Sequence, residues 1–181
     1  MKFCACKVLE SGAQSVISMD DALSQLRLDA GFDDGKVKTC IAAAFDFAEN
    51  YLWRGLRPQT IVSSYALDGC NYAELARAQN FSGLISVKYS AAGGEREIPI
   101  LGVSVDDTLD VPRAYFPEPD ASGDVFAPIK ITYKTSAPRI VPEAIKQALL
   151  IAVAQFYDDR DSPDLSAASR ILDIYKTRNF L

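Results

Sequence analysis

The chain has 181 residues, is 49% hydrophobic and 24% charged, carries a formal net charge of -5 and contains no histidine. The absence of histidine excludes serine-histidine and cysteine-histidine nucleophile pairs and histidine metal sites. The acidic pI of about 4.8 disfavours the large basic surface that drives tight binding to nucleic acid or anionic lipid. This composition predicts a soluble globular protein of one domain that needs neither a disulfide nor a metal to fold.

The first third of the chain predicts a short strand followed by two helices. Phe3–Leu9 is compatible with a strand, and Ser18 is a candidate N-cap for a helix that runs to about Leu28. A clearer helix is predicted from about Gly35 to Trp53. Apolar residues recur along it at helical spacing, namely Val37, Cys40, Ile41, Ala44, Phe45, Ala48 and Leu52.

The middle third, from Pro58 to Pro138, has the texture of antiparallel strands. Short segments rich in Val, Ile, Tyr and Thr alternate there with glycine, proline and aspartate. A hairpin turn is expected at Ala91–Gly94, a short helix at Asn71–Gln79 and an exposed loop at Phe116–Asp124. The candidate strands are Gln59–Leu67, Leu84–Tyr89, Glu97–Val105, Val111–Phe116 and Ile129–Thr135.

Helical periodicity returns at Pro142, where a helix is predicted to run to about Asp158. Apolar residues surround most of this helix, so it must be covered on more than one side. The cover could come from the β lobe, from the other helices or from a neighbouring subunit. A last helix is predicted over Leu165–Lys176.

Together these elements predict an α+β fold, in which a small bundle of about four helices carries an inserted antiparallel β lobe. We expect a single domain, residues 1–181, with a helical core formed by 1–56 and 139–181 and a β-rich lobe at 57–138. The start of the chain lacks the long apolar region of a signal peptide, and no segment approaches transmembrane length.

Few motifs suggest catalysis or metal binding, and each has a simpler interpretation. Asp158, Asp159 and Asp161 could form an acid-base or divalent-metal site, but short charge clusters at helix ends are usually solvated. The four cysteines, at positions 4, 6, 40 and 70, lack the paired CxxC units of a zinc site, so reduced thiols are expected. We therefore predict no catalytic, cofactor-binding or metal site and no enzymatic activity.

Three stretches, taken in order, carry a resemblance that spans nearly the whole chain. They are Ile17–Asp29 with the following helix to Leu52, then Arg54–Thr60, and finally Ile129–Tyr133 with Val141–Ala148 and Phe156–Asp161. Their order and spacing resemble the head-tail connector (adaptor) proteins of long-tailed bacteriophages, in the longer variety with a β insertion. Members of that family often have Glu where this chain has Asp161.

The resemblance implies a structural virion protein. Such proteins form a ring, typically of twelve subunits, beneath the portal vertex, where the ring extends the DNA channel and docks the next neck or tail component. The implied partners are further copies of the chain, the portal protein and a neck or tail completion protein. DNA would pass without specific binding, and no membrane is involved. The implied location is the virion of a phage or prophage, after DNA packaging, with assembly in the bacterial host cytoplasm.

Within this interpretation, the last two helices are expected to make the subunit contacts. The residues expected near these contacts are Gln147, Phe156, Tyr157, Arg160 and Tyr175, although Arg160 could pair within its own subunit. The C-terminal tail is expected to dock on the portal through Lys176, Arg178, Phe180 and Leu181.

Two alternative functions make different structural demands. A small carboxylate- or metal-dependent hydrolase requires Asp158, Asp159 and Asp161 to converge in a concave pocket. A nucleic-acid-binding accessory protein requires lysines and arginines to collect on one face despite the negative net charge.

Overall fold

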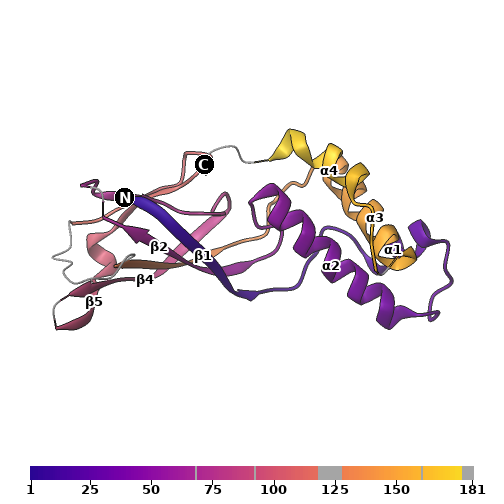
Figure 1. Ribbon diagram of the computed structural model, residues 1–181, viewed down its shortest axis with the longest axis horizontal. Helices are drawn as coiled ribbons and strands as arrows, with labels where there is room; N and C mark the ends of the chain where they lie inside the picture. Colours follow the sequence, from indigo (N-terminus) through magenta and orange to yellow (C-terminus); the bar gives the residue numbers. More distant parts are fainter. Residues whose placement is uncertain (68, 92, 118–127, 160, 177–181) are drawn as a thin grey trace. The chain divides into compact units, whose positions relative to one another are not determined.

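The computed structural model describes residues 1–67, 69–91, 93–117, 128–159 and 161–176. The chain divides into a β unit, formed by Met1–Ala13 and Arg57–Ala137, and a helical unit, formed by Gln14–Leu56 and Pro138–Leu181 (Figure 1). This confirms the predicted α+β fold class. The helical core expected at residues 1–56 begins only at Gln14, because the first thirteen residues belong to the β unit.

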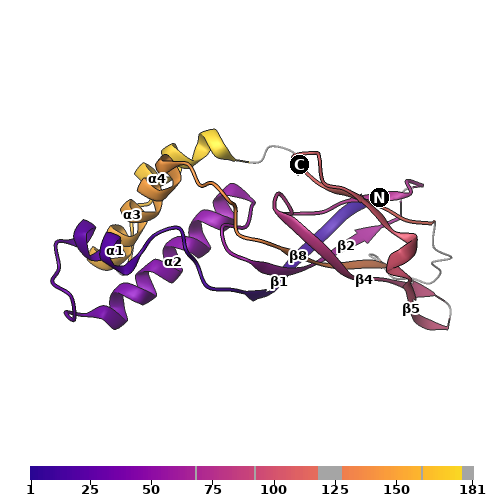
Figure 2. The ribbon, with the colours of Figure 1, turned by 180° about the vertical axis from the view of Figure 1, so that it is seen from behind.

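A five-stranded antiparallel sheet is the framework of the β unit. Its strand order is β1-β2-β8-β4-β5, so β8, the last of these strands in the sequence, is the central one (Figure 2). Ala91 pairs with Gly94 across the β4-β5 hairpin, as predicted, and Gly94 has a φ of +115° that side chains rarely adopt. The strands are β1 (Lys2–Ser11), β2 (Gln59–Ala66), β4 (Phe81–Ala91), β5 (Gly94–Ile98) and β8 (Ile129–Thr135).

A second, three-stranded sheet has the order β3-β7-β6. Its strands are β3 (Tyr72–Glu74), β7 (Arg113–Tyr115) and β6 (Ser104–Asp106). The prediction of one strand over Glu97–Val105 is wrong, because a 3-10 turn, η1 (Ile100–Gly102), separates β5 from β6. The loop expected at Phe116–Asp124 lies largely outside the described residues.

The helix expected at Asn71–Gln79 is also absent, since this segment contains β3. Two buried tyrosines of the large sheet donate hydrogen bonds to backbone carbonyls of this segment. The hydroxyl of Tyr65 donates to the Glu74 carbonyl, and the hydroxyl of Tyr133 donates to the Ala76 carbonyl. Burial raises the pKa of both phenols, which keeps them protonated as donors. These tertiary contacts override the local helix preference of the segment.

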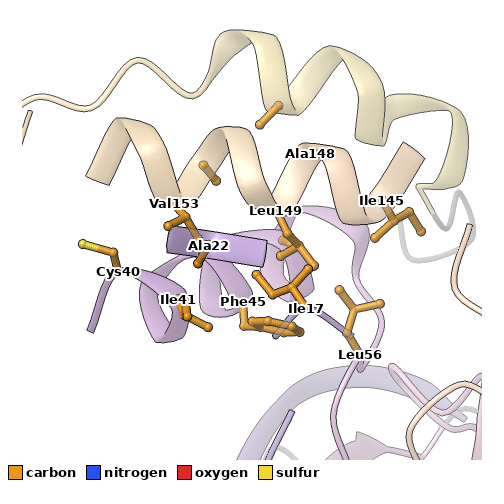
Figure 3. Packing of buried hydrophobic residues seen from close by; sticks show 14 of the residues in the cluster. Ile17, Ala22, Cys40, Ile41, Phe45, Leu56, Ile145, Ala148, Leu149 and Val153 are labelled. Atoms are coloured by element: carbon orange, nitrogen blue, oxygen red, sulfur yellow. The ribbon is translucent and has the colours of Figure 1, made fainter. Parts of the chain in front are cut away.

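The helical unit contains the four predicted helices. None of the helices in the described ranges has the length and hydropathy of a membrane span. α3 contacts each of the other three helices, and Figure 3 shows Leu149 and Val153 of α3 on the side that faces α2. The bounds are α1 (Met19–Leu26), α2 (Asp34–Leu52), α3 (Glu143–Asp158) and α4 (Ser166–Leu172), which continues into a 3-10 turn, η2 (Asp173–Tyr175).

Much of the apolar circumference of α3 is buried or partly buried inside the helical unit. One side is fully buried, and Leu150, Ile151 and Phe156 are partly buried against the same core. The other helices therefore supply cover for this helix. Apolar side chains that remain largely exposed in the unit lie elsewhere, at Phe32 (62%), Ile140 (85%) and Ile174 (82%).

We predict that Leu149→Ala lowers the free energy of unfolding by about 2–5 kcal/mol, because Leu149 is fully buried where α3 meets its neighbours. Urea denaturation followed by circular dichroism measures the change. Ile140→Ala is the control and should alter stability by no more than about 0.5 kcal/mol. Equal losses in the two variants would contradict the described core.

Candidate functional site

A groove of about 470 Å³ lies in the helical unit, between the segment that leads into α1 and the first two turns of α3. Gln147, one of the predicted subunit-contact residues, is exposed and lines this groove. The groove combines apolar side chains with charged ones, so it offers both packing surface and hydrogen-bonding groups. Its lining residues are Val16, Ile17, Asp21, Glu143, Ala144, Lys146, Gln147 and Leu150.

The α1 side of the groove is held by a capping box at the predicted N-cap. The Asp21 backbone N–H donates to Ser18 Oγ (3.0 Å), while Asp21 Oδ2 accepts from the Ser18 backbone N–H (2.8 Å) and hydroxyl (2.7 Å). These bonds, the one from the Ser18 backbone foremost, hold the pKa of Asp21 below its ordinary value. On the α3 side, Lys146 Nζ pairs with Glu143 Oε1 at 2.6 Å.

The segment before the cap is fixed by the side chain of Gln14. Gln14 Oε1 accepts from the backbone N–H groups of Val16 (3.0 Å) and Ile17 (3.2 Å), and Gln14 Nε2 donates to the Ile17 carbonyl (2.8 Å). One amide thus satisfies three backbone groups of a turn that has no regular secondary structure. The groove consequently has a defined wall on both sides.

Tyr157, another predicted contact residue, has partners within its own helical unit. Its hydroxyl donates to Asp33 Oδ2 (3.2 Å), and Lys36 Nζ lies 3.5 Å from the centre of its ring. Phe156 is partly buried against the helical core. Both side chains therefore contribute to the fold, and their role in subunit contacts stays a prediction.

The start of the C-terminal tail is held by Tyr51 of α2. The Tyr51 hydroxyl donates to Asp173 Oδ1, which raises the pKa of Tyr51, and Lys176 Nζ lies 4.8 Å from the centre of the Tyr51 ring. Tyr175 is partly buried against the core. The remaining predicted contact and docking residues, Arg160, Arg178, Phe180 and Leu181, lie outside the described residues.

The acidic cluster after α3 caps a loop. Asp158, Asp159 and Asp161 are all exposed, and Asp159 Oδ1 accepts from the backbone N–H groups of Asp161 (3.2 Å) and Ser162 (3.1 Å). Across the described ranges, no group of three or more acidic or cysteine side chains is placed to hold a metal ion. These three residues do not form the concave pocket that the hydrolase hypothesis requires.

The large sheet carries a feature that the sequence reasoning missed. The side opposite the packed core, which we call the lysine face, presents Lys2, Lys7, Lys88, Lys130 and Lys134. The signal was available in β8, where Lys130, Thr132 and Lys134 alternate with buried Ile and Tyr residues. Five of the 19 basic residues of an acidic chain thus share one face, all of them lysines, which meets part of what the nucleic-acid alternative requires.

We predict that Ser18→Ala raises the pKa of Asp21 part of the way to its ordinary value, because the side-chain bonds disappear while the Ser18 backbone bond remains. A lowered pKa stabilises the fold above the ordinary aspartate pKa, and this contribution is lost as the pH falls through the lowered value. An NMR titration of the Asp21 carboxyl measures the shift. Loss of the N-cap should also cost about 1 kcal/mol at neutral pH.

Ser24→Ala is the matched control, since Ser24 is an exposed serine of the same helix. The Asp21 titration should be unchanged in this variant. A Ser18→Ala titration identical to wild type would show that the capping box does not form in solution.

No protein-family model and no curated protein match the chain. Solved structures of gene transfer agent (GTA) particles do match it in fold. A chain from the neck of an empty GTA particle, computed with C6 symmetry, matches with a TM-score of 0.73 and 17% identity over 98% of both chains. A chain from the virion of a native GTA particle matches with a TM-score of 0.69 and 16% identity over 98% of both chains. A chain from the neck of a native GTA particle, computed with C12 symmetry, matches with a TM-score of 0.65 and 16% identity over 97% of both chains. The chain therefore shares its fold, over almost its full length, with components of gene transfer agent particles.

Proposed function

We propose that the chain is a head-tail connector (adaptor) protein in the neck of a phage-like particle, with a structural and not a catalytic role. The observation that carries this proposal is the match in fold to a particle-neck chain at a TM-score of 0.73 over 98% of both chains. Because the match covers 98% of both chains, it includes the β unit as well as the helices. The similarity is therefore not limited to a common arrangement of helices. The sequence resemblance to bacteriophage connectors supports the same function independently.

In this proposal the chain assembles into a closed ring, with twelve copies in the particle. Neck structures with this fold were computed with C6 and C12 symmetry. A cyclic ring joins two different surfaces of adjacent copies. The exposed apolar residues Phe32, Ile140 and Ile174 supply surface for such contacts.

Among the predicted contact residues, Gln147 is the best placed for a neighbouring copy, because it is exposed in a groove with fixed walls. Phe156, Tyr157 and Tyr175 already pack within the subunit. In this proposal their packing against the helical core positions the contact surface. Arg160 is proposed to belong to the same surface.

The ring would extend the DNA channel below the portal and present a docking surface to the next neck or tail component. The tail that begins at Lys176 and includes Arg178, Phe180 and Leu181 is proposed to bind the portal. The contact of Lys176 Nζ with the Tyr51 ring, 4.8 Å from its centre, supports this role, because it ties the start of the tail to α2. The protein would act in the virion, after assembly in the cytoplasm of the host.

Native mass measurement tests the proposal directly, on the chain alone and on the chain mixed with the portal protein of its own particle. We expect a complex that contains portal and a ring of connector copies. A chain that assembles on its own before meeting the portal also fits the proposal. A chain that remains monomeric under both conditions contradicts it.

We predict that Gln147→Arg weakens each subunit contact about tenfold or more, which corresponds to about 1.4 kcal/mol per contact. Because every contact in the ring carries the change, the ring population should fall. A bulky charge would then occupy the groove that receives the neighbour. Ala42→Arg adds the same side chain at an exposed position of α2 and should leave assembly unchanged. If Gln147→Arg assembles like wild type while remaining folded, the groove is not a subunit contact.

A further inference from the structure

The lysine face follows from strand register. On β8, Ile129, Ile131 and Tyr133 are fully buried, so Lys130 and Lys134 project to the opposite side of the sheet. The outward positions of β2 are its second, fourth, sixth and eighth residues, which are only partly buried. Lys2 and Lys7 of β1 pair with two of these positions, Ala66 and Val62, and Lys88 of β4 pairs with Lys130. All five lysines therefore share one side of the sheet.

The centre of this face contains no carboxylate. The three central strands, β2, β8 and β4, have no Asp or Glu on either side. Hydroxyl groups lie at outward positions between the lysines. These are the side chains of Thr60, Ser64, Thr132, Ser86 and Ser90.

Acidic residues of the face are confined to the two edge strands. They are Glu10 on β1 and Glu95 and Glu97 on β5. Glu95 binds Lys88 Nζ (3.4 Å) and Lys130 Nζ (3.2 Å), which reduces the repulsion between two lysines that lie directly opposite each other. The Lys130 interaction foremost, with Lys88 adding to it, holds the pKa of Glu95 below its ordinary value. Lys7 and Lys134 are exposed, and no carboxylate in the described part of the chain pairs with them.

We propose that the lysine face contacts the phosphate backbone of duplex DNA, without sequence preference. This inference rests on the proposed function, because a connector ring surrounds DNA. Five lysines against three glutamates make the face positive in a chain whose net charge is -5. An anionic partner therefore fits it, and lysine ammonium groups and Ser or Thr hydroxyls are common donors to phosphate oxygens.

The composition of the face favours DNA over an acidic protein. Cores of protein interfaces are enriched in Tyr, Trp, Phe, Met and Arg and depleted in Lys and Ser. None of the enriched types faces outward on β2, β8 or β4, whereas Lys, Ser and Thr dominate there. A face of this composition is suited to a hydrated, charged polymer.

The same side chains predict a weak contact that ignores sequence. Bidentate base recognition uses Arg, Asn or Gln, and these are also absent from the outward positions of the three central strands. Three exposed lysines of the face have no carboxylate partner in the described part of the chain: Lys2, Lys7 and Lys134. They would release counterions with a slope of about -2.7 in log affinity against log salt. A fourfold rise in salt would then weaken binding about 40-fold. Such a surface meets DNA without holding it at physiological salt.

The test is fluorescence anisotropy of a labelled random-sequence duplex, titrated with the full chain between about 50 and about 200 mM salt. Wild type should show the slope given above. The triple variant Lys2→Gln, Lys7→Gln, Lys134→Gln removes the three unpaired lysines. It should bind about tenfold more weakly or worse at the lowest salt, and its slope should approach zero. Lys134→Gln alone should reduce the slope by about one.

The matched control is Lys38→Gln, Arg139→Gln, Arg170→Gln, which removes the same charge from exposed positions of the helical unit. It should keep the wild-type slope. Equal losses in both triple variants would overturn the inference, because net charge and not the face would then govern binding. Absence of salt-dependent binding by wild type at the lowest salt would also overturn it.

Two further measurements separate this inference from its alternatives. Labelled polyglutamate should bind more weakly than the duplex; equal or tighter binding overturns the DNA assignment in favour of an acidic protein surface. Native mass measurement of the lysine variant with portal should show normal assembly. The wild-type chain could bind DNA through the lysine face and yet never assemble with portal. That result would support the DNA contact and contradict the connector proposal.

Discussion

Both units depend on one late stretch of the chain, from the start of β8 at Ile129 to the end of α3 at Asp158. β8 pairs with β2 on one side and β4 on the other, and these two strands do not pair with each other. α3 contacts α1, α2 and α4. The central element of the sheet and the central element of the helix bundle are therefore near neighbours in sequence. Neither hydrophobic core is complete without this stretch.

The charge of the chain is distributed in a way that its net value conceals. Strand alternation sends apolar residues of β8 to the core and its lysines to the opposite side. The carboxylates of the sheet lie at its edge strands, and others cap a helix start at Asp21 and a loop at Asp159. An acidic protein can thus present one basic face while remaining acidic elsewhere. In the proposed connector ring, this combination would allow contact with phosphate without strong retention.

Sequence reasoning succeeded where a local pattern and the tertiary environment agree. The periodicity of α2 and α3, the Val-, Ile-, Tyr- and Thr-rich composition of β2 and β8, and the N-cap at Ser18 each predict an element that the structure contains. It failed where long-range contacts decide. Residues 71–79 have helix-forming side chains, but the hydroxyl of Tyr133, 57 residues from Ala76, binds the Ala76 carbonyl. The nearer Tyr65 binds the carbonyl of Glu74.

The candidate site was only partly predictable for the same reason. Gln147, expected near subunit contacts within the connector interpretation, lines the groove, and its role there stays a prediction. The partners of Tyr157 and Tyr51 come from segments more than a hundred residues away. The lysine face requires the pairing of β1, β2, β8 and β4, which composition cannot supply. Net charge is a sum over the whole molecule, so the negative value argued against any large basic surface. It could not reveal a basic face that strand register creates.

The late position of β8 also has a consequence for biosynthesis. While the chain emerges from the ribosome at about 5–20 residues per second, β2 and β4 spend several seconds with their inner edges unpaired. Unpaired strand edges recruit other strands, including those of nascent chains on the same polysome. Serine and threonine side chains on both strands, with Lys88 on β4, make one side of each strand more polar than its core side during that interval. The residues proposed to meet DNA in the finished particle would thus also protect the polypeptide from aggregation before it is complete.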